Sequence, residues 1–172
     1  MLVFDIETNG LLYDVSKIHC IATFCTKKEK SYVYNDQDDE TPSIREGINQ
    51  LMEADTLAGH NIIGYDLAVL RKLSSEFHTG AKCVDTLVLS RLYHPNLMEI
   101  DKKRKWRQMP LQLYGRHSLE AYGYRLGEYK GDFGKTSDWQ QWSQEMQDYM
   151  VQDVNVTTKL CEHFRPYLTR VG

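Results

Sequence analysis

The first seven residues constrain the fold most, because they form a short apolar segment that carries two acidic residues. Residues 1–7 are largely apolar and are followed by a turn pair at residues 9–10, which predicts a β-strand. Side chains alternate between the two faces of a strand, so Asp5 and Glu7 point to the same face. Adjacent carboxylates repel each other and burial raises their pKa values, whereas a bound cation removes both problems. The alternative is a strand end whose acids reach solvent or cap a turn.

The rest of the chain predicts one domain of strands and helices. A chain of 172 residues, 41% hydrophobic and 26% charged, is long enough for one packed domain, which we place over residues 1–172. Strands come first and helices are interleaved later, which is typical of an α/β domain with a central mixed sheet flanked by helices. The expected strands are residues 1–7, 17–25, 30–35 and 55–60, and the expected helices are residues 42–53, 65–73, a segment from near Asp85, 118–126 and 138–164.

Residues 94–116 differ from this pattern, because they are rich in basic residues and have few periodic apolar positions. We expect a mobile basic loop there, with Trp106 inside it. Its basic residues are Lys102, Lys103, Arg104, Lys105, Arg107 and Arg116.

Asp153 interrupts the apolar stripe of the last expected helix. The stripe includes Met146, Met150 and Leu160 at helical spacing, and Asp153 follows Tyr149 by four residues on the same side. An acid on a buried stripe is costly unless it is paired or bound to a metal. The alternative for Asp153 is a buried salt bridge.

Asp66 and Asp85 each stand near an expected helix start, where an aspartate caps free backbone amides and interacts well with the helix dipole. For Asp66 this capping role and a functional role are both open. For Asp85 we favour capping.

Composition excludes few classes of protein. No apolar run approaches the length of a membrane span and no secretory signal is visible, so we expect a cytoplasmic protein without a membrane partner. The net charge of −3 counts mildly against a nucleic-acid binder, unless several acids share a metal site.

A zinc site from His19, Cys20 and Cys25 lacks a second ligand pair at a recognisable spacing, so the cysteines are expected to be small buried hydrophobes.

Taken together, these acids resemble the tyrosine subclass of the DEDD exonuclease superfamily, which has an RNase H-like fold. The superfamily pattern is D-x-E on the first strand, N-x-x-x-[YF]-D, and Y-x-x-x-D on a late helix. Here the first motif is Asp5 to Glu7, the second is Asn61 to Asp66, and the third is Tyr149 to Asp153. The histidine subclass would carry histidine at position 148, which is aspartate here.

A closer resemblance covers residues 1 to about 165. The segments DIETNGLL, CVDTLVLSRLYHPNL, HSLEAYGYRLGEYKGDF and YMVQDVNVT look like the proofreading domain of family A DNA polymerases from short-tailed bacteriophages. Such polymerases continue into a much larger polymerase region. The chain therefore corresponds to an excised domain, a subunit of a split polymerase or a stand-alone exonuclease, in the host cytoplasm if a phage encodes it.

The resemblance implies a 3′→5′ exonuclease that releases nucleoside 5′-monophosphates from a single-stranded DNA 3′ end, with two Mg²⁺ or Mn²⁺ ions. It assigns Asp5, Glu7 and Asp153 to one metal, with Asp5 also reaching a second metal that Asp66 holds mainly through water. Tyr149 would orient the attacking water, because a phenol with a pKa of about 10 stays protonated. A DNA polymerase is the implied partner, in proofreading or DNA-end trimming.

Substrate contacts are expected from two further regions. Thr8, Asn9 and Leu11 follow Glu7 directly and would contact the terminal nucleotide, with Asn61 and Tyr65 lining the same cleft; turn formation and packing are the alternative. In the basic loop, Lys103, Arg104 and Lys105 would hold the phosphate backbone and Trp106 would stack on a base, with a solvated charged loop as the alternative.

Three other functions stay open at this stage. A 3′→5′ exoribonuclease of the same superfamily would use the same chemistry and differ only in tolerance of the 2′-hydroxyl. A non-catalytic nucleic-acid-binding module would keep the fold without the divalent-ion site. A structural protein would use the same acids in salt bridges, so that removing Asp5 or Asp153 would destabilise it.

Overall fold

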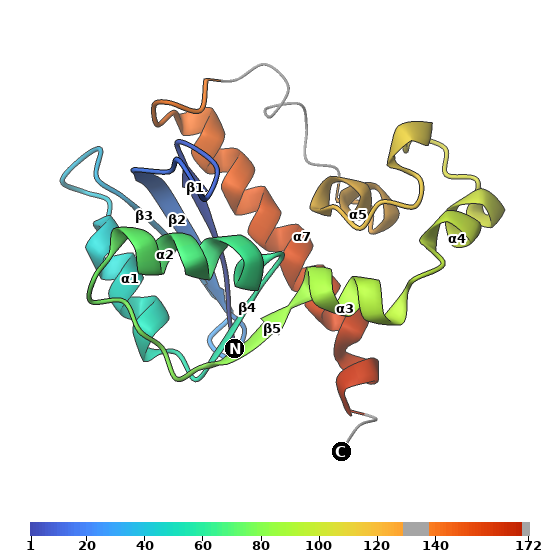
Figure 1. Cartoon of the computed structure of the whole chain (residues 1–172), viewed down its shortest axis with the longest axis horizontal. Coiled ribbons are helices and arrows are strands. Elements are labelled where there is room, and N and C mark those ends of the chain that lie inside the picture. The colour runs from blue at the N-terminus through green and yellow to red at the C-terminus, as the bar shows by residue number, and fades with distance from the viewer. Residues whose placement is uncertain (129–137, 170–172) are drawn as a thin grey trace.

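The computed structural model describes residues 1–128 and 138–169, and its centre is a five-stranded sheet (Figure 1). The strands are β1 (Leu2–Thr8), β2 (Ile18–Cys25), β3 (Lys30–Asn35), β4 (Thr56–Gly59) and β5 (Lys82–Asp85). They lie in the order β3-β2-β1-β4-β5, with β1 in the middle. The pairs β1–β2 and β2–β3 are antiparallel, and the pairs β1–β4 and β4–β5 are parallel. The predicted mixed sheet is thus confirmed.

Helices cover both faces of this sheet. The helical elements of the described residues are α1 (Ile44–Glu53), the π-helical turn η1 (Ile62–Asp66), α2 (Leu67–Leu73), α3 (Thr86–Tyr93), α4 (Leu97–Arg104), the 3₁₀ turn η2 (Leu111–Leu113), α5 (Leu119–Arg125) and α7 (Gln144–Thr169). Of these, α1 and α2 pack on one face of the sheet and α7 on the other. The start of α1 is fixed by a capping box, in which Ser43 and Glu46 each accept the other's backbone N–H through their side chains. No helix within residues 1–128 or 138–169 combines the length and the apolar character needed to span a bilayer.

Alternation along β1 divides the core into two layers. Phe4 packs with Leu51 of α1 and Leu70 of α2 on one face. Val3 packs with Met146 and Met150 of α7 on the other face. Odd-numbered positions of β1 therefore face α7, and this register directs Asp5 and Glu7 toward α7 as well.

The distal half of α7 supports a second group of helices. Val156, Leu160 and Phe164 of α7 form a separate core with Leu97 and Tyr122. This core joins α3, α4 and α5 into a helical lobe over residues 86–126, which stands beside the sheet in Figure 1.

The structure corrects three expectations. The basic loop predicted over residues 94–116 is wrong for Leu97–Arg104, which forms α4. The last helix begins at Gln144 rather than at Asp138, because Ser143 accepts the amide of Met146 at its start. The short strand β5 was not predicted, since Lys82–Asp85 has too few residues for a clear alternation.

Candidate active site

Three carboxylates meet between the end of β1 and the middle of α7. Ligand oxygens of Asp5, Glu7 and Asp153 all lie within 4.8 Å of one another. Asp153 is buried and Glu7 is nearly so. Among the described residues this is the one group of three or more histidine, cysteine or acidic side chains close enough to share a metal ion. The structure therefore brings together acids that are more than 140 residues apart in the sequence.

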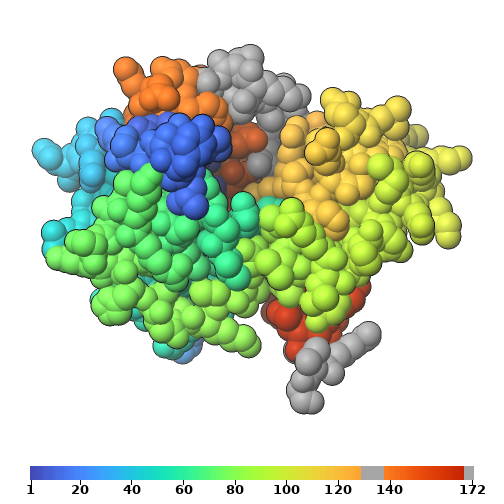
Figure 2. Space-filling view, in the orientation of Figure 1, coloured from blue at the N-terminus to red at the C-terminus, as the bar shows by residue number. Residues whose placement is uncertain are grey.

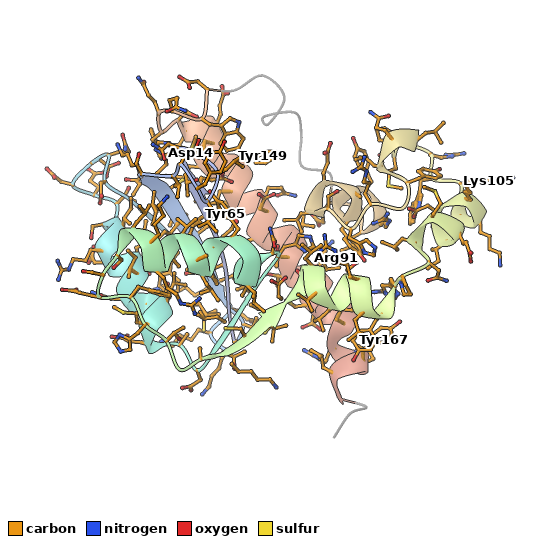
Figure 3. All side chains as sticks on the ribbon, viewed as in Figure 1. Asp14, Tyr65, Arg91, Lys105, Tyr149 and Tyr167 are labelled. Atoms are coloured by element: carbon orange, nitrogen blue, oxygen red, sulfur yellow. The ribbon has the colours of Figure 1, made fainter. Side chains whose placement is uncertain are left out.

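The packing of α7 explains how Asp153 reaches this cluster. Met146, Met150 and Val154 recur at helical spacing and pack against the sheet. Asp153 lies on the same side of the helix and is 7% exposed. Tyr149 precedes it by one turn, is half-buried, and lies at the same end of the sheet as Tyr65 and Asp14 in Figure 3.

Asp66 reaches the cluster from a different element, the π-helical turn η1. In this turn the amide of Leu67 donates to the carbonyl of Ile62, five residues earlier. The Asp66 side chain is buried, does not cap α2, and has one carboxylate oxygen without a hydrogen-bond partner. The sequence left a capping role and a functional role open for Asp66, and the structure shows no cap.

Burial dominates the electrostatics of Asp66. It raises the pKa of this carboxyl to about 8, while hydrogen bonds to the backbone of Ile6 and to the side chain of Asp5 act in the opposite direction. These bonds also place Asp66 directly against β1. A buried carboxyl with an unused oxygen beside three further acids fits a site for divalent cations, which neutralise such a cluster.

The donor atoms of the cluster are carboxylate oxygens, which suit hard cations such as Mg²⁺ or Mn²⁺. The possible zinc site of His19, Cys20 and Cys25 does not form. Cys20 is buried, and burial raises the pKa of its thiol far above the usual range. His19 uses its Nε2 to donate to the carbonyl of Trp139 at 2.8 Å.

A pocket of about 450 Å³ opens beside Glu7, and we call it the Glu7 pocket. In Figure 2 the turn after β1 lies at one side of a recess whose other side is the helical lobe. The pocket contains four of the five residues expected to contact the terminal nucleotide. Its lining residues are Ile6, Glu7, Thr8, Asn9, Gly10, Leu11, Asp14, Tyr65, Trp139 and Gln140.

Hydrogen bonds within the lining show which side chains shape the pocket. The hydroxyl of Tyr65 bonds both the Gly10 carbonyl and the Thr8 hydroxyl. The side-chain oxygen of Asn9 accepts the amides of Ser16 and Lys17, so it holds the turn. Leu11, by contrast, is 63% exposed at the pocket mouth.

Trp139 and Gln140 are pocket residues that the sequence did not single out. The carbonyl of Trp139 is held by buried His19, and the side chain of Gln140 donates to the carbonyl of Asn9. No local motif marks this segment, because it reaches β1 only through the tertiary fold.

The fifth residue, Asn61, lies elsewhere. Its backbone has a φ of 63°, in the left-handed region that asparagine tolerates, and its amide donates to Asp85. It lines a second pocket together with Arg91 and Arg116. Asp85 also accepts the amides of Ile63 and Leu87, so its predicted capping role is confirmed.

The predicted phosphate contacts Lys103, Arg104 and Lys105 are exposed at the end of α4. Figure 3 shows Lys105 at the far end of the helical lobe, well apart from Tyr149. The structure therefore does not bring these cations to the carboxylate cluster.

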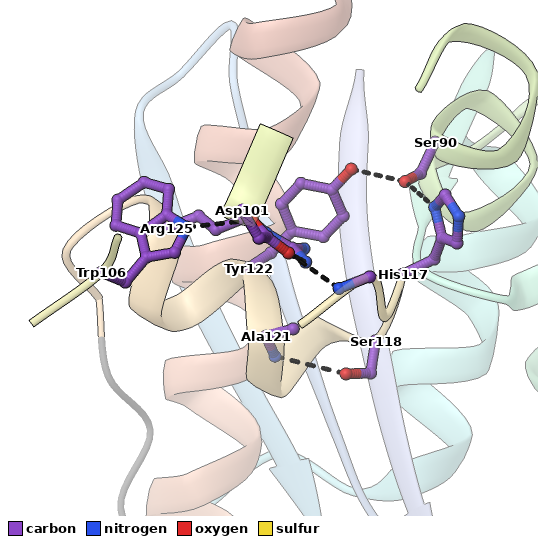
Figure 4. A network of polar contacts seen from close by, with 9 residues as sticks. Ser90, Asp101, Trp106, His117, Ser118, Ala121, Tyr122 and Arg125 are labelled. Carbon is purple, nitrogen blue, oxygen red and sulfur yellow. Dashed lines mark hydrogen bonds and ion pairs between the residues drawn. The ribbon is translucent and has the colours of Figure 1, made fainter. Parts of the chain in front are cut away.

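A buried ion pair holds this part of the lobe together (Figure 4). Asp101 is fully buried and accepts two hydrogen bonds from Arg125, at 3.0 and 2.7 Å. It also accepts from the indole of Trp106 and the amide of Gly115. Trp106 is thus half-buried and bound within the lobe, with Arg104 over its ring, a geometry that does not favour base stacking.

The mixed sheet with a cluster of acids at the end of its central strand defines the class of protein. A family model of the RNase H superfamily matches residues 2–165, so the chain belongs to this superfamily. The chain is 38% identical to a DNA-directed DNA polymerase of Enterobacteria phage T3 over 193 aligned positions, and equally similar to that of Escherichia phage T7 over 191. Both alignments cover 94% of the chain. These relatives confirm the predicted resemblance to phage polymerases.

The chain spans about a quarter of the length of these curated relatives, since the alignments cover 26% of each. A solved structure described as the apo form of a nuclease superposes with a TM-score of 0.64 at 20% identity. That match covers 99% of the chain and 74% of the nuclease, and it supports the fold.

Proposed function

We propose that this protein is a metal-dependent 3′→5′ exonuclease that hydrolyses the terminal phosphodiester of DNA and releases nucleoside 5′-monophosphates. The observation that carries the proposal is the convergence of Asp5, Glu7 and Asp153 within 4.8 Å, on a chain of the RNase H superfamily. The relatedness to two phage DNA polymerases supports DNA as the substrate.

Asp5, Glu7 and Asp153 would hold one divalent cation, and Asp5 with Asp66 would hold a second. When bound, such ions lower the pKa of a coordinated water and stabilise charge on the leaving 3′ oxygen. The buried Asp66 carboxyl supports this assignment, because burial disfavours its charged form and raises its pKa to about 8, and a bound cation would stabilise the charged form at the unused oxygen.

Tyr149 would position the attacking water rather than remove its proton. It stands one helical turn from Asp153 on the same side of α7, which places both residues on the side of the helix that carries the cluster. A phenol has an ordinary pKa of about 10 and stays protonated at neutral pH, which makes it a donor or acceptor that orients a ligand.

The Glu7 pocket would receive the terminal nucleotide. Its volume of about 450 Å³ lies directly beside the carboxylates, and it mixes apolar walls with the polar groups of Thr8 and Gln140. Leu11, at the mouth, would contact the terminal base. Thr8, Asn9 and Tyr65 would act by holding the turn that forms the wall, as their hydrogen bonds indicate.

We further propose that the protein works at a DNA 3′ end together with a DNA polymerase, in proofreading or end trimming. The support is that the curated relatives are DNA polymerases in which the matched region is about a quarter of the length. The basic end of α4 would contact more distant phosphates. Changing Lys103, Arg104 and Lys105 to alanine should then reduce the salt dependence of DNA binding.

The test is digestion of a 5′-labelled single-stranded DNA oligomer with Mg²⁺, with Mn²⁺ and with a chelator. We expect shortening by one nucleotide at a time, lost in chelator and in the Asp5→Asn/Glu7→Gln variant. An Asp55→Asn variant is the matched control, because Asp55 is an exposed acid at the opposite end of the parallel strands. A matched RNA oligomer tests the sugar preference.

Shortening that persists in the Asp5→Asn/Glu7→Gln variant would exclude the carboxylate cluster as the site. Absence of shortening in either metal would exclude an exonuclease that acts alone. Faster hydrolysis of RNA than of DNA would assign the protein as an exoribonuclease.

A further inference from the structure

One pocket borders the carboxylate cluster at Glu7, a second pocket opens after the end of β4, and the two differ in charge. The Glu7 pocket contains Glu7 and Asp14, and none of its described lining residues is lysine or arginine. The second pocket has a volume of about 490 Å³ and contains Arg91, Arg116 and His117. We call it the Arg91–Arg116 pocket. A polyanionic strand would be repelled from the first pocket and attracted to the second.

The strand order places the Arg91–Arg116 pocket next to the cluster. β4 lies parallel beside β1, and a side chain at Gly59, the last residue of β4, would come within 3.0 Å of the Phe4 carbonyl. His60 and Asn61 follow Gly59 directly and line the pocket. One edge of the pocket is therefore one strand away from Asp5.

The two arginines of the pocket are available to a ligand. Arg91 and Arg116 are exposed, and within the described part of the chain neither forms an ion pair. The neighbouring acid, Asp85, is buried, accepts three backbone amides and forms no ion pair with either arginine among the described residues. A guanidinium group offers a planar pair of donors that matches the oxygens of a phosphodiester.

The third polar group, His117, is held in place by a buried network that Figure 4 shows. Its Nδ1 bonds the hydroxyl of Ser90 at 2.5 Å, and the same hydroxyl bonds the phenol of Tyr122. Ser90 is fully buried and Tyr122 nearly so. The wall of the pocket is therefore built on the core of the helical lobe rather than on an isolated surface loop.

From this asymmetry we propose that the Arg91–Arg116 pocket binds a phosphate of the retained DNA strand, on the 5′ side of the scissile bond. The inference rests on the proposed exonuclease function and adds the direction of the strand. The terminal nucleotide enters the Glu7 pocket, and the strand that remains after cleavage passes between β4 and α5 toward the helical lobe. Arg91 indeed lies between Tyr65 and Lys105 in Figure 3.

The test compares a long and a minimal substrate in an Arg91→Gln/Arg116→Gln variant. On a single-stranded 12-mer, KM should rise about tenfold with kcat unchanged, because the lost contacts lie away from the reacting phosphate. The p-nitrophenyl ester of thymidine 5′-monophosphate has no retained strand, so its hydrolysis should be unaffected. The slope of log KM against log salt should decrease by about 0.7, the value for one phosphate contact on a single strand.

The matched control is Arg45→Gln/Arg71→Gln, which removes the same charge from exposed arginines on α1 and α2. Equal KM and equal salt slopes in the two double variants would overturn the proposal, as would a matching loss on the p-nitrophenyl ester.

Fluorescence anisotropy of the labelled 12-mer in chelator separates this inference from the proposed function. If the unmodified protein hydrolyses neither substrate, the exonuclease proposal fails. Binding about tenfold weaker in the Arg91→Gln/Arg116→Gln variant than in its control would still support the phosphate pocket. Equal binding would exclude it.

Discussion

Asp66 and Asp85 have the same residue type, the same position at a helix start and the same exposure of 4%, yet the fold uses them in opposite ways. Asp85 accepts the amides of Asn61, Ile63 and Leu87, so its charge is satisfied by the backbone. Asp66 makes no cap, keeps one oxygen without a partner and has a raised pKa. Burial of an aspartate therefore does not show its role; the number of donors facing it does.

The two residues are also connected. Asp85 fixes the amides of Asn61 and Ile63, which lie at the start of the π-helical turn that carries Asp66. The satisfied aspartate thus holds in place the backbone that presents the unsatisfied one. Stabilisation and function are separated between two neighbouring acids.

The largest expected difference between the two is in activity. Asp66→Asn should lower the rate of exonuclease hydrolysis by about 100-fold or more, because it removes a ligand charge from the cluster. Asp85→Asn should leave the rate per folded molecule within about tenfold. Initial rates on a labelled oligomer, corrected for the folded fraction by circular dichroism, measure both. Similar losses in the two variants would remove the distinction.

The free energy of unfolding should respond in the reverse order, with the larger effect for the Asp85 variant. Asp85→Asn places an amide donor against backbone donors and should lower the free energy of unfolding by about 1–3 kcal/mol. Asp66→Asn in chelator at pH 8 should leave it unchanged or higher, since a costly buried charge is removed. Urea unfolding gives both values. A large loss of stability for Asp66→Asn alone would instead indicate a structural acid.

The pH dependence of stability should follow Asp66. Its ordinary pKa of 3.8 is raised to about 8 by burial, so between these values the folded protein retains a proton that the unfolded chain has released. The free energy of unfolding in chelator should therefore fall as pH rises from about 4 to 8, by an amount on the order of a few kcal/mol. Asp66→Asn should flatten this dependence, whereas Asp85→Asn should keep it.

The smallest expected difference between the Asp66 and Asp85 variants is in how much divalent ions stabilise the folded protein. Mg²⁺ at about tenfold its dissociation constant should stabilise the unmodified protein by about 1.4 kcal/mol, through binding to the folded state alone. The rise in Tm should persist in Asp85→Asn and shrink in Asp66→Asn. An equal rise in both variants, with Ca²⁺ as a comparison ion, would place the cations away from Asp66.

These two aspartates also show how far sequence reasoning extends. The D-x-E pair, the helical spacing of Tyr149 and Asp153, and the cap at Asp85 are local patterns, and each predicted its place in the structure. The role of Asp66 was open between capping and function, because the π-helical turn that withdraws it from the cap depends on hydrogen bonds to Asp85, about 20 residues later. Periodicity does not report such a contact.

For residues 94–116 the prediction from the sequence was definite but wrong in part. Their charges predicted a loop, but α4 forms because Asp101 is buried against Arg125 and Trp106. A single buried acid among five basic neighbours is not visible as a core position in the sequence. The pocket residues Trp139 and Gln140 were missed for the same reason, since tertiary contacts alone bring them to β1.

The π-helical turn has a consequence for insertions and deletions. A π turn holds one residue more than an α-helical turn, and each residue of an α-helix advances the side chains by about 100°. Loss of one residue between Ile62 and Tyr65 would let the segment continue smoothly into α2 as an ordinary helix. Asp66 would then rotate away from β1 together with the start of α2, which follows it directly, while the sheet stayed in place. Deletion of a single codon here would therefore keep the sheet but remove Asp66 from the carboxylate cluster.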